Sequence, residues 1–307
     1  MKAISKLLRT LGNRDFLFIA SVVLGIALGR VARYTQPLML PALAVAMTVS
    51  MTQVASSAFR PLRKLVRPML LSVVLNYVIF STLMLILARW LVPERELWMG
   101  FVLMAAAPPG VAVIPFSYIL GGDTAFAVIG SVGGYLAALV VAPAMALLLV
   151  GESFVQPAKL ITILLELVLV PLVLSRQLLA GRLKPHVERW RGKVVNWAFF
   201  LVIFTIVGLN REVFLRQPQV VVLIAVITVA TSFGLGFVLE KALEKLHLDR
   251  STRVTYVLMG TLKNGGFAGA TALALFGERA SVAPAVGAAI VVPYLLWLGI
   301  RWGDRKR

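Results

Sequence analysis

Cysteine is absent from this chain of 307 residues, and only two histidines are present, His186 and His247. The lack of cysteine excludes disulfides, thiolate nucleophiles and cysteine-ligated metals. Both histidines lie in charged stretches, so a zinc or haem centre is not expected. The sequence predicts no cofactor.

Charged residues are also scarce, at 14% of the chain, against about 25% in an ordinary soluble domain. Hydrophobic residues make up 60%, and the mean hydropathy is +0.91. With 31 basic and 13 acidic side chains, the chain cannot cover so large an apolar content with polar surface. These values predict an all-α polytopic membrane protein.

Ten apolar runs follow one another along the chain, and a membrane-spanning helix needs about 20 apolar residues. Ten transmembrane helices therefore use most of the sequence and leave short connections. The runs cover residues 16–29, 36–58, 68–92, 97–120, 124–150, 158–175, 194–209, 218–239, 254–276 and 281–300.

The net charge of +18 is distributed unevenly between the two sides of these ten spans. If the N-terminus is cytoplasmic, 22 of the 31 Lys and Arg residues fall in inside segments, 8 fall outside, and Lys263 lies within a span. This bias predicts both termini in the cytoplasm and a multi-pass protein of the plasma (inner) membrane. It also assigns the positive charge to contact with the anionic lipids of the inner leaflet, and no nucleic-acid partner is expected.

Two matching Gly/Pro-containing segments divide the chain into halves. The fourth span contains Pro108-Pro109-Gly110 and, after eleven intervening residues, Gly122-Asp123; the ninth contains Gly265 and, after eleven intervening residues, Gly277-Glu278. Five spans in each half is an odd number, so the second half enters the membrane from the opposite face. The pattern predicts two inverted repeats, residues 1–150 and 151–307, with helices broken near the membrane centre. Gly and Pro are also common in ordinary membrane helices.

A broken helix exposes backbone N–H and C=O groups, which hydrocarbon cannot satisfy. The breaks are therefore expected to line a cavity or to meet polar partners. Beyond each break, the N-terminus of a half-helix presents partial positive charge, which favours an anion.

At these breaks the sequence resembles the bile acid:sodium symporter family of secondary transporters. The stretch from Pro108 to Asp123 is similar to that family's Pro-Gly-Gly-x-Ala-Ser-Asn segment with its following Tyr and Gly-Asp. The stretch from Gly260 to Ala268 is similar to its Glu-x-Gly-Met-Gln-Asn-Ser-Gly segment. The resemblance implies a panel domain (spans 1, 2, 6 and 7) and a core domain (spans 3–5 and 8–10), with spans 4 and 9 unwound and crossed. It also implies a substrate site between panel and core, beside the crossing.

The chain departs from the family at the positions that the resemblance assigns to sodium. Val113 and Ile114 replace Ser-Asn, Ala127 replaces a Ser, Met259 replaces a Glu, and Lys263 replaces a Gln. Two oxygen-bearing side chains remain, Asn76 on the third span and Ser131 on the fifth. Because the carboxylate is lost and an ammonium is gained, we expect the family's sodium sites, and any metal site, to be absent.

Lys263 is the most informative residue in the sequence. It lies nine residues into the ninth span, about 13 Å deep at ~1.5 Å per residue, near the centre of a hydrocarbon core ~30 Å thick. Ionisable groups at that depth mark functional sites more often than not. We interpret Lys263 as a fixed cation at the helix crossing that replaces sodium or holds an anionic substrate; the structural alternative is a tether for carbonyls freed near Pro108–Val113. A further alternative is that Lys263 loses its proton in one conformation and so couples transport to protons.

Other polar residues accompany Lys263. Glu166 is the only acid well inside a span, and it either pairs with Lys263, titrates with a transported proton, or bonds to a neighbouring helix. Candidate transport residues besides Lys263 are Asn76, Pro108, Pro109, Gly110, Ser131, Thr261, Asn264, Gly265 and Gly266.

The favoured function is a secondary transporter that moves a small organic anion across the membrane without sodium. A cation–proton antiporter or an auxin-efflux-type carrier of related fold is the first alternative, although such antiporters use paired intramembrane acids and this chain lacks the pair. A polytopic membrane enzyme is disfavoured because the spans offer no His, no Cys and only Glu166 as an acid. A channel or sensor remains a further alternative.

Overall fold

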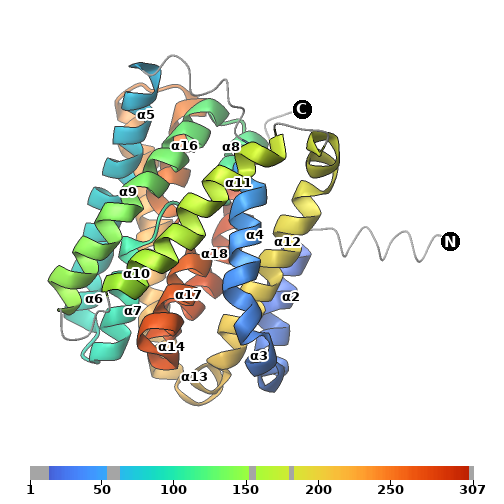
Figure 1. The fold of residues 1–307 in the computed structure, drawn as a ribbon. Helices are drawn as coiled ribbons and strands as arrows, with labels where there is room; N and C mark the ends of the chain where they lie inside the picture. Colours follow the sequence, from blue (N-terminus) through green and yellow to red (C-terminus); the bar gives the residue numbers. More distant parts are fainter. Residues whose placement is uncertain (1–13, 54–62, 152–156, 180–182, 304–307) are drawn as a thin grey trace.

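A computed structural model describes residues 14–53, 63–151, 157–179 and 183–303, which form a bundle of helices (Figure 1). No strand forms in these residues; one isolated antiparallel bridge pairs Pro109 with Lys263. The helices are α2 (Arg14–Ala27), α3 (Gly29–Thr35), η1 (Gln36–Leu38), α4 (Met39–Met51), α5 (Arg63–Val73), η3 (Val74–Phe80), α6 (Ser81–Leu91), α7 (Arg95–Ala106), α8 (Val113–Ile119), α9 (Thr124–Val150), α10 (Pro157–Leu164), η4 (Leu165–Leu169), α11 (Val170–Leu179), α12 (Lys184–Leu209), α13 (Arg211–Arg216), α14 (Pro218–Val229), η5 (Ala230–Gly234), α15 (Leu235–Lys245), α16 (Arg250–Thr261), α17 (Gly265–Phe276) and α18 (Glu278–Gly303).

The expected all-α polytopic membrane architecture is confirmed. In the described residues, six helices are long and apolar enough to cross a membrane, and α2 with the run Gly29–Met51 forms a further pair, bent by 107°. The six cover Leu65–Leu91, Thr124–Val150, Ala158–Leu179, Lys184–Leu209, Pro218–Lys245 and Glu278–Gly303. The two Gly/Pro-containing segments form the short pairs α7–α8 and α16–α17. A total of ten spans stays a prediction.

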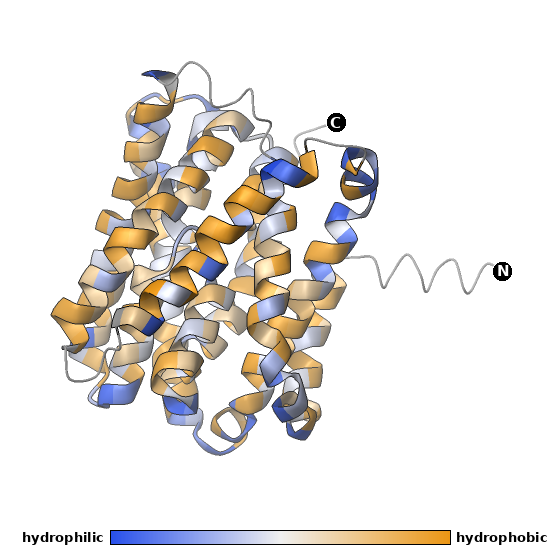
Figure 2. Cartoon of the chain, viewed as in Figure 1, coloured by the Kyte–Doolittle hydropathy of each residue, from blue (hydrophilic) through white to orange (hydrophobic). Residues whose placement is uncertain are grey.

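Polar residues gather at the two ends of the bundle, and apolar residues cover its middle (Figure 2). Large apolar side chains on the helices face outward, among them Val140, Leu148 and Val222, as expected for a surface in contact with lipid. We call the end where α4 and α11 finish and α12 begins the basic end. It lies at the top of Figure 1, and the helix ends that form it carry Arg176 in the last turn of α11 and Lys184 at the start of α12.

The helices pack in two groups. The first contains α2, α3, α4, α11 and α12, with α12 packed along α2 and α4. The second contains α5–α9 and α14–α18, with α5 against α9 and α17 and α18 against α7. We refer to them as the small group and the large group; α12 contacts α17 and α18 across the boundary between them.

The two helix breaks differ in how they arise. Helix α7 ends before Pro108 and Pro109, which lack an N–H and force the residue before them into an extended conformation; Ala107 has ψ 148°. Helix α16 ends at Thr261 without a proline, and Leu262 is extended. Helix α17 then begins because the Asn264 side chain accepts a hydrogen bond from the N–H of Phe267 at 3.0 Å.

Candidate functional site

The two breaks meet in the interior of the large group. The N–H of Gly110 donates to the carbonyl of Leu262 at 2.9 Å, and the N–H of Asn264 donates to the carbonyl of Pro108, also at 2.9 Å. A β-carbon on Gly110 would lie 3.1 Å from the carbonyl oxygen of Lys263, so glycine permits this close approach. Each unwound segment therefore satisfies part of the other's backbone, and together they form a short two-stranded crossing.

Lys263 lies at this crossing with its ammonium group directed into the protein. The Nζ atom donates to the carbonyl of Ala105 at 2.7 Å and to that of Ala107 at 2.8 Å. It also lies 4.1 Å from the centre of the Tyr77 ring, within range of a cation–π interaction. The side chain is 8% exposed. The ammonium thus caps the C-terminal end of α7, where the helix dipole is negative and a cation is stabilised.

The carbonyls that bind Lys263 differ slightly from the expected ones. The sequence placed them near Pro108–Val113, whereas the structure places them at Ala105 and Ala107, just before the two prolines. The reason is the extended conformation of Ala107, which leaves the last carbonyls of α7 without helical N–H partners.

Asn76 of η3 caps the C-terminal end of α16 in a similar way. Its amide nitrogen donates to the carbonyl of Met259 at 3.0 Å and to that of Leu262 at 3.3 Å. The sequence predicts that Asn76 is a remaining ion ligand through its side-chain oxygen. In the described residues that oxygen has no hydrogen-bond partner, and the side chain acts as a donor to carbonyls that could otherwise face a cation.

The remaining positions matched to sodium ligands are occupied by packed side chains. Ile114 forms a small buried cluster with Val128 and Val132. The Met259 sulfur accepts a hydrogen bond from Ser72 at 3.1 Å. Val113, Ala127 and Ser131 are buried as well; in the described part of the chain, the Ser131 hydroxyl lacks a partner. Hydrocarbon and thioether groups are poor ligands for a hard cation such as sodium.

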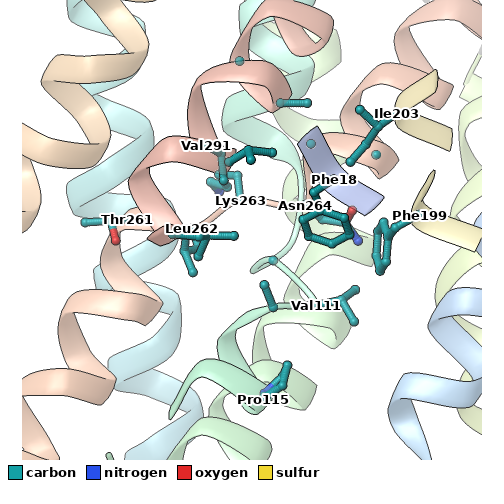
Figure 3. Close-up of a pocket in the computed structure, with 18 of the residues that line it drawn as sticks. Phe18, Val111, Pro115, Phe199, Ile203, Thr261, Leu262, Lys263, Asn264 and Val291 are labelled. Atoms are coloured by element: carbon teal, nitrogen blue, oxygen red, sulfur yellow. The ribbon is translucent and has the colours of Figure 1, made fainter. Parts of the chain in front are cut away.

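A cavity of about 510 Å³ lies between the two groups of helices, beside the crossing. Phe18 of α2 and Phe199 of α12 lie on one side of it, and Thr261 and Leu262 lie on the other (Figure 3). Lys263 and Asn264 belong to the segment that passes between these two sides (Figure 3). The lining is mainly apolar, and Gln53 and Arg191 contribute to it at the basic end.

The other predicted transport residues gather around this cavity. Gly110, Gly265 and Gly266 line it, as do Thr261 and Asn264. The Thr261 hydroxyl lies 2.9 Å from the Tyr294 hydroxyl, and the Asn264 amide donates to the Met47 sulfur of α4 at 3.3 Å. Pro108 and Pro109 form the crossing itself. Transport roles for these residues stay a prediction.

Glu166 lies away from this assembly. It is an exposed residue of η4, and the described residues contain no ion pair between it and Lys263, whose Nζ is bonded to the α7 carbonyls. The pairing considered from the sequence is therefore wrong for this conformation. Proton coupling through Glu166 stays a prediction.

The end opposite the basic end is closed by contacts between the two groups of helices. The Asn210 amide of α12 donates to the Ser281 hydroxyl of α18 at 2.9 Å, and both side chains are buried. The Lys159 ammonium of α10, which continues into α11 of the small group, donates to the carbonyl of Ala274 in α17 at 2.5 Å. The cavity, in contrast, includes Arg191 and the exposed Gly192 in its lining, so it reaches the basic end.

An ion pair at the same closed end links α18 to the segment that precedes α7. Arg279 of α18 donates two hydrogen bonds of 2.6 Å to Glu94, which precedes α7, and one of 2.8 Å to Gln217, which precedes α14. The hydrogen bonds from Arg279 lower the pKa of the Glu94 carboxyl, although partial burial opposes them. Since a lowered folded-state pKa favours the folded state above the unfolded pKa, this pair stabilises the group at neutral pH and is lost in acid.

Sequence reasoning missed several contributors to the site. Tyr77 and Phe80, whose rings lie 4.1 and 5.7 Å from the Lys263 ammonium, come from the third span and are brought to the ninth only by tertiary packing. Phe18, Phe199 and Met47 belong to apolar runs in which no single residue stands out. The one available signal was the position of Tyr77 directly after Asn76.

Broken helices that cross inside a membrane bundle, next to a cavity between two helical groups, are typical of secondary transporters. The model of the Sodium Bile acid symporter family matches residues 40–217, which is more than half of the sequence. The chain belongs to this family, and its members are transporters rather than enzymes. No curated protein matches the chain in a sequence comparison.

Proposed function

We propose that this protein is a secondary transporter that moves a small organic anion by alternating access without sodium, with Lys263 in place of the coupling cation. The observation that carries the proposal is the position of the Lys263 ammonium, which donates to the carbonyls of Ala105 and Ala107 at the helix crossing. The hydrogen bonds of the Lys263 ammonium go to carbonyl groups of the protein itself. The ammonium therefore supplies positive charge to the crossing rather than a direct ligand to the solute.

The cavity supports an organic anion as the solute. Its apolar side chains, Phe18, Phe199 and Ile203 among them, favour the hydrocarbon part of a solute. Positive charge comes from Lys263 behind the crossing, from the N-terminus of α17 at Gly265, and from Arg191 at the basic end. Such a field favours a solute with negative charge.

Sodium independence is tested by transport in proteoliposomes. A counterflow screen of anionic metabolites identifies a solute, and its uptake is then compared in sodium and in choline at equal ionic strength. We expect equal rates, because the carboxylate is lost at Met259 and the carbonyl of Leu262 is already bonded to Asn76. A steep dependence of uptake on sodium, or a screen in which no organic anion is carried, would contradict the proposal.

We also propose that residues 1–150 and 151–307 form two inverted repeats in the plasma (inner) membrane, with both termini in the cytoplasm. The matching order of elements supports the repeats. In the first half, a span that contains the short π-helix η3 precedes α7–α8; in the second half, a span that contains the short π-helix η5 precedes α16–α17. The charge bias supports the orientation. In this proposed orientation the basic end, where the cavity opens, faces the cytoplasm and lies next to the anionic inner leaflet.

This orientation predicts opposite accessibility for Lys184 and Arg95, which begin α12 and α7. Single cysteines introduced at these positions are the only thiols in the protein, since the natural chain has none. An impermeant maleimide added outside intact cells is expected to label Arg95→Cys and to leave Lys184→Cys unlabelled until the membrane is opened. Labelling of both from outside would refute the topology.

A further inference from the structure

The cavity has a charged group on the wall opposite the crossing. Arg191 lies on α12, in the small group of helices, and lines the cavity at the basic end. Its Nε atom is buried and has no hydrogen-bond partner in the described residues. The acid nearest in sequence, Glu188, lies 4.0 Å from Lys184 and also attracts the Arg191 charge through space. A buried guanidinium donor without a partner is unfavourable unless an anion or water binds to it.

A second unpartnered group lies on the neighbouring helix of the same wall. Ser50 of α4 is 3% exposed and lines the cavity, and its hydroxyl has no partner within the described ranges. Gln53 follows one turn later and also lines the cavity. Because α4 packs along α12, a guanidinium, a hydroxyl and a carboxamide are gathered at one end of an otherwise apolar chamber.

We propose that Arg191, Ser50 and Gln53 form an anion-binding subsite at the basic end of the cavity, which holds the carboxylate of the transported solute. The guanidinium offers two parallel N–H groups to a carboxylate, and the Ser50 hydroxyl and the Gln53 amide add donors. This inference rests on the proposed function and assigns one wall of the cavity to recognition of charge.

The position of the subsite determines how the solute lies. Arg191 precedes Phe199 by eight residues on α12, which is about 12 Å along the helix axis, and Phe199 faces the crossing segment (Figure 3). A carboxylate at Arg191 therefore directs the apolar part of the solute toward Phe18 and Phe199. Because the subsite belongs to the small group, it keeps its position when the large group moves. It therefore selects anions at the basic end before or after each passage of the solute across the membrane.

The subsite is tested with a matched pair of probes, 4-phenylbutyrate and its neutral amide, 4-phenylbutyramide. Binding to the purified full-length protein is followed by isothermal titration calorimetry. We expect wild-type protein to bind the carboxylate more tightly than the amide, and Arg191→Gln to lower the affinity for the carboxylate at least about tenfold while leaving that for the amide unchanged. Ser50→Ala is expected to give a smaller loss in the same direction.

Arg189→Gln is the matched control, because Arg189 lies on the same helix, is exposed, and is absent from the cavity lining. It removes the same charge and is expected to bind both probes as the wild type does. Unfolding temperatures of all variants show whether each is folded. Equal carboxylate affinity in wild type and Arg191→Gln, or a wild type that does not prefer the carboxylate, would overturn the subsite.

A lipid phosphate could bind the same groups, so the titration is repeated in nanodiscs of phosphatidylcholine and of phosphatidylglycerol. If phosphatidylglycerol weakens carboxylate binding to wild type alone, the subsite belongs to lipid, and the proposal for the solute is wrong. Failure of the subsite is distinguishable from failure of the transport function. In the first case Arg191→Gln transports the counterflow solute with unchanged KM, whereas in the second the wild type transports no organic anion.

Discussion

Replacing Lys263 with glutamine is expected to lower the rate of solute counterflow at least about tenfold and to reduce the unfolding temperature. The change removes the ammonium from the carbonyls of Ala105 and Ala107 and from the face of Tyr77. The Ala105 carbonyl still accepts a hydrogen bond from Ser81 at 2.6 Å, but the Ala107 carbonyl loses its partner, and leaving a buried carbonyl unpartnered costs about 1–3 kcal/mol. The glutamine amide can reach at most part of this arrangement, and the positive charge at the crossing is lost in any case.

Lys241→Gln provides the control for this experiment. Lys241 is exposed on α15 and pairs with Glu244, and such a surface pair contributes about 0–1 kcal/mol. Its counterflow rate and unfolding temperature should match those of the wild type. A Lys263→Gln protein with unchanged transport and stability would remove the central role assigned to this lysine, whereas lost stability with full transport would limit it to a structural tether.

Cross-linking Asn210→Cys to Ser281→Cys is expected to abolish transport. In this conformation the two side chains join the small and large groups at the closed end, with 2.9 Å between the Asn210 amide nitrogen and the Ser281 hydroxyl. Alternating access requires that this contact open so that the cavity reaches the opposite side of the membrane. A short bifunctional thiol reagent of the thiosulfonate type should hold it closed, and a reductant should restore transport.

Because the natural chain contains no cysteine, the reagent can react only with the two introduced thiols. Each single-cysteine variant, treated with the same reagent, is the control and should keep its activity. If the cross-linked double variant transports at the rate of the untreated protein, the two groups do not separate at this end, and the proposed mechanism is wrong.

The break after α7 and the depth of Lys263 could be predicted because each has a local cause. The adjacent prolines Pro108 and Pro109 remove two successive N–H donors and end α7, and the depth of Lys263 follows from its distance to the end of an apolar run. The break after Thr261 contains no proline, and its geometry depends on pairing with Pro108 and Gly110 from the other half of the chain. Sequence could only mark that break through the Gly265-Gly266 pair and the family resemblance.

The contacts of the site were harder to predict, because they join spans that are far apart in the sequence. Asn76 was expected to offer its oxygen to an ion, but it donates its amide to carbonyls of α16. Glu166 was considered as a partner of Lys263, yet it lies exposed on η4. In both cases the sequence gives the polar group and its depth, while the direction of the side chain is set by how the spans pack.

The central claim is that Lys263 replaces sodium, and the most direct test is whether the purified wild-type protein binds sodium. Its unfolding temperature is measured in sodium chloride and in potassium chloride at equal ionic strength, over a range of concentrations. A ligand present at 100 times its Kd stabilises the folded state by about 2.7 kcal/mol, which a thermal melt detects easily. We predict identical unfolding temperatures in the two salts at every concentration; a rise that is specific to sodium and saturates with its concentration would contradict the account.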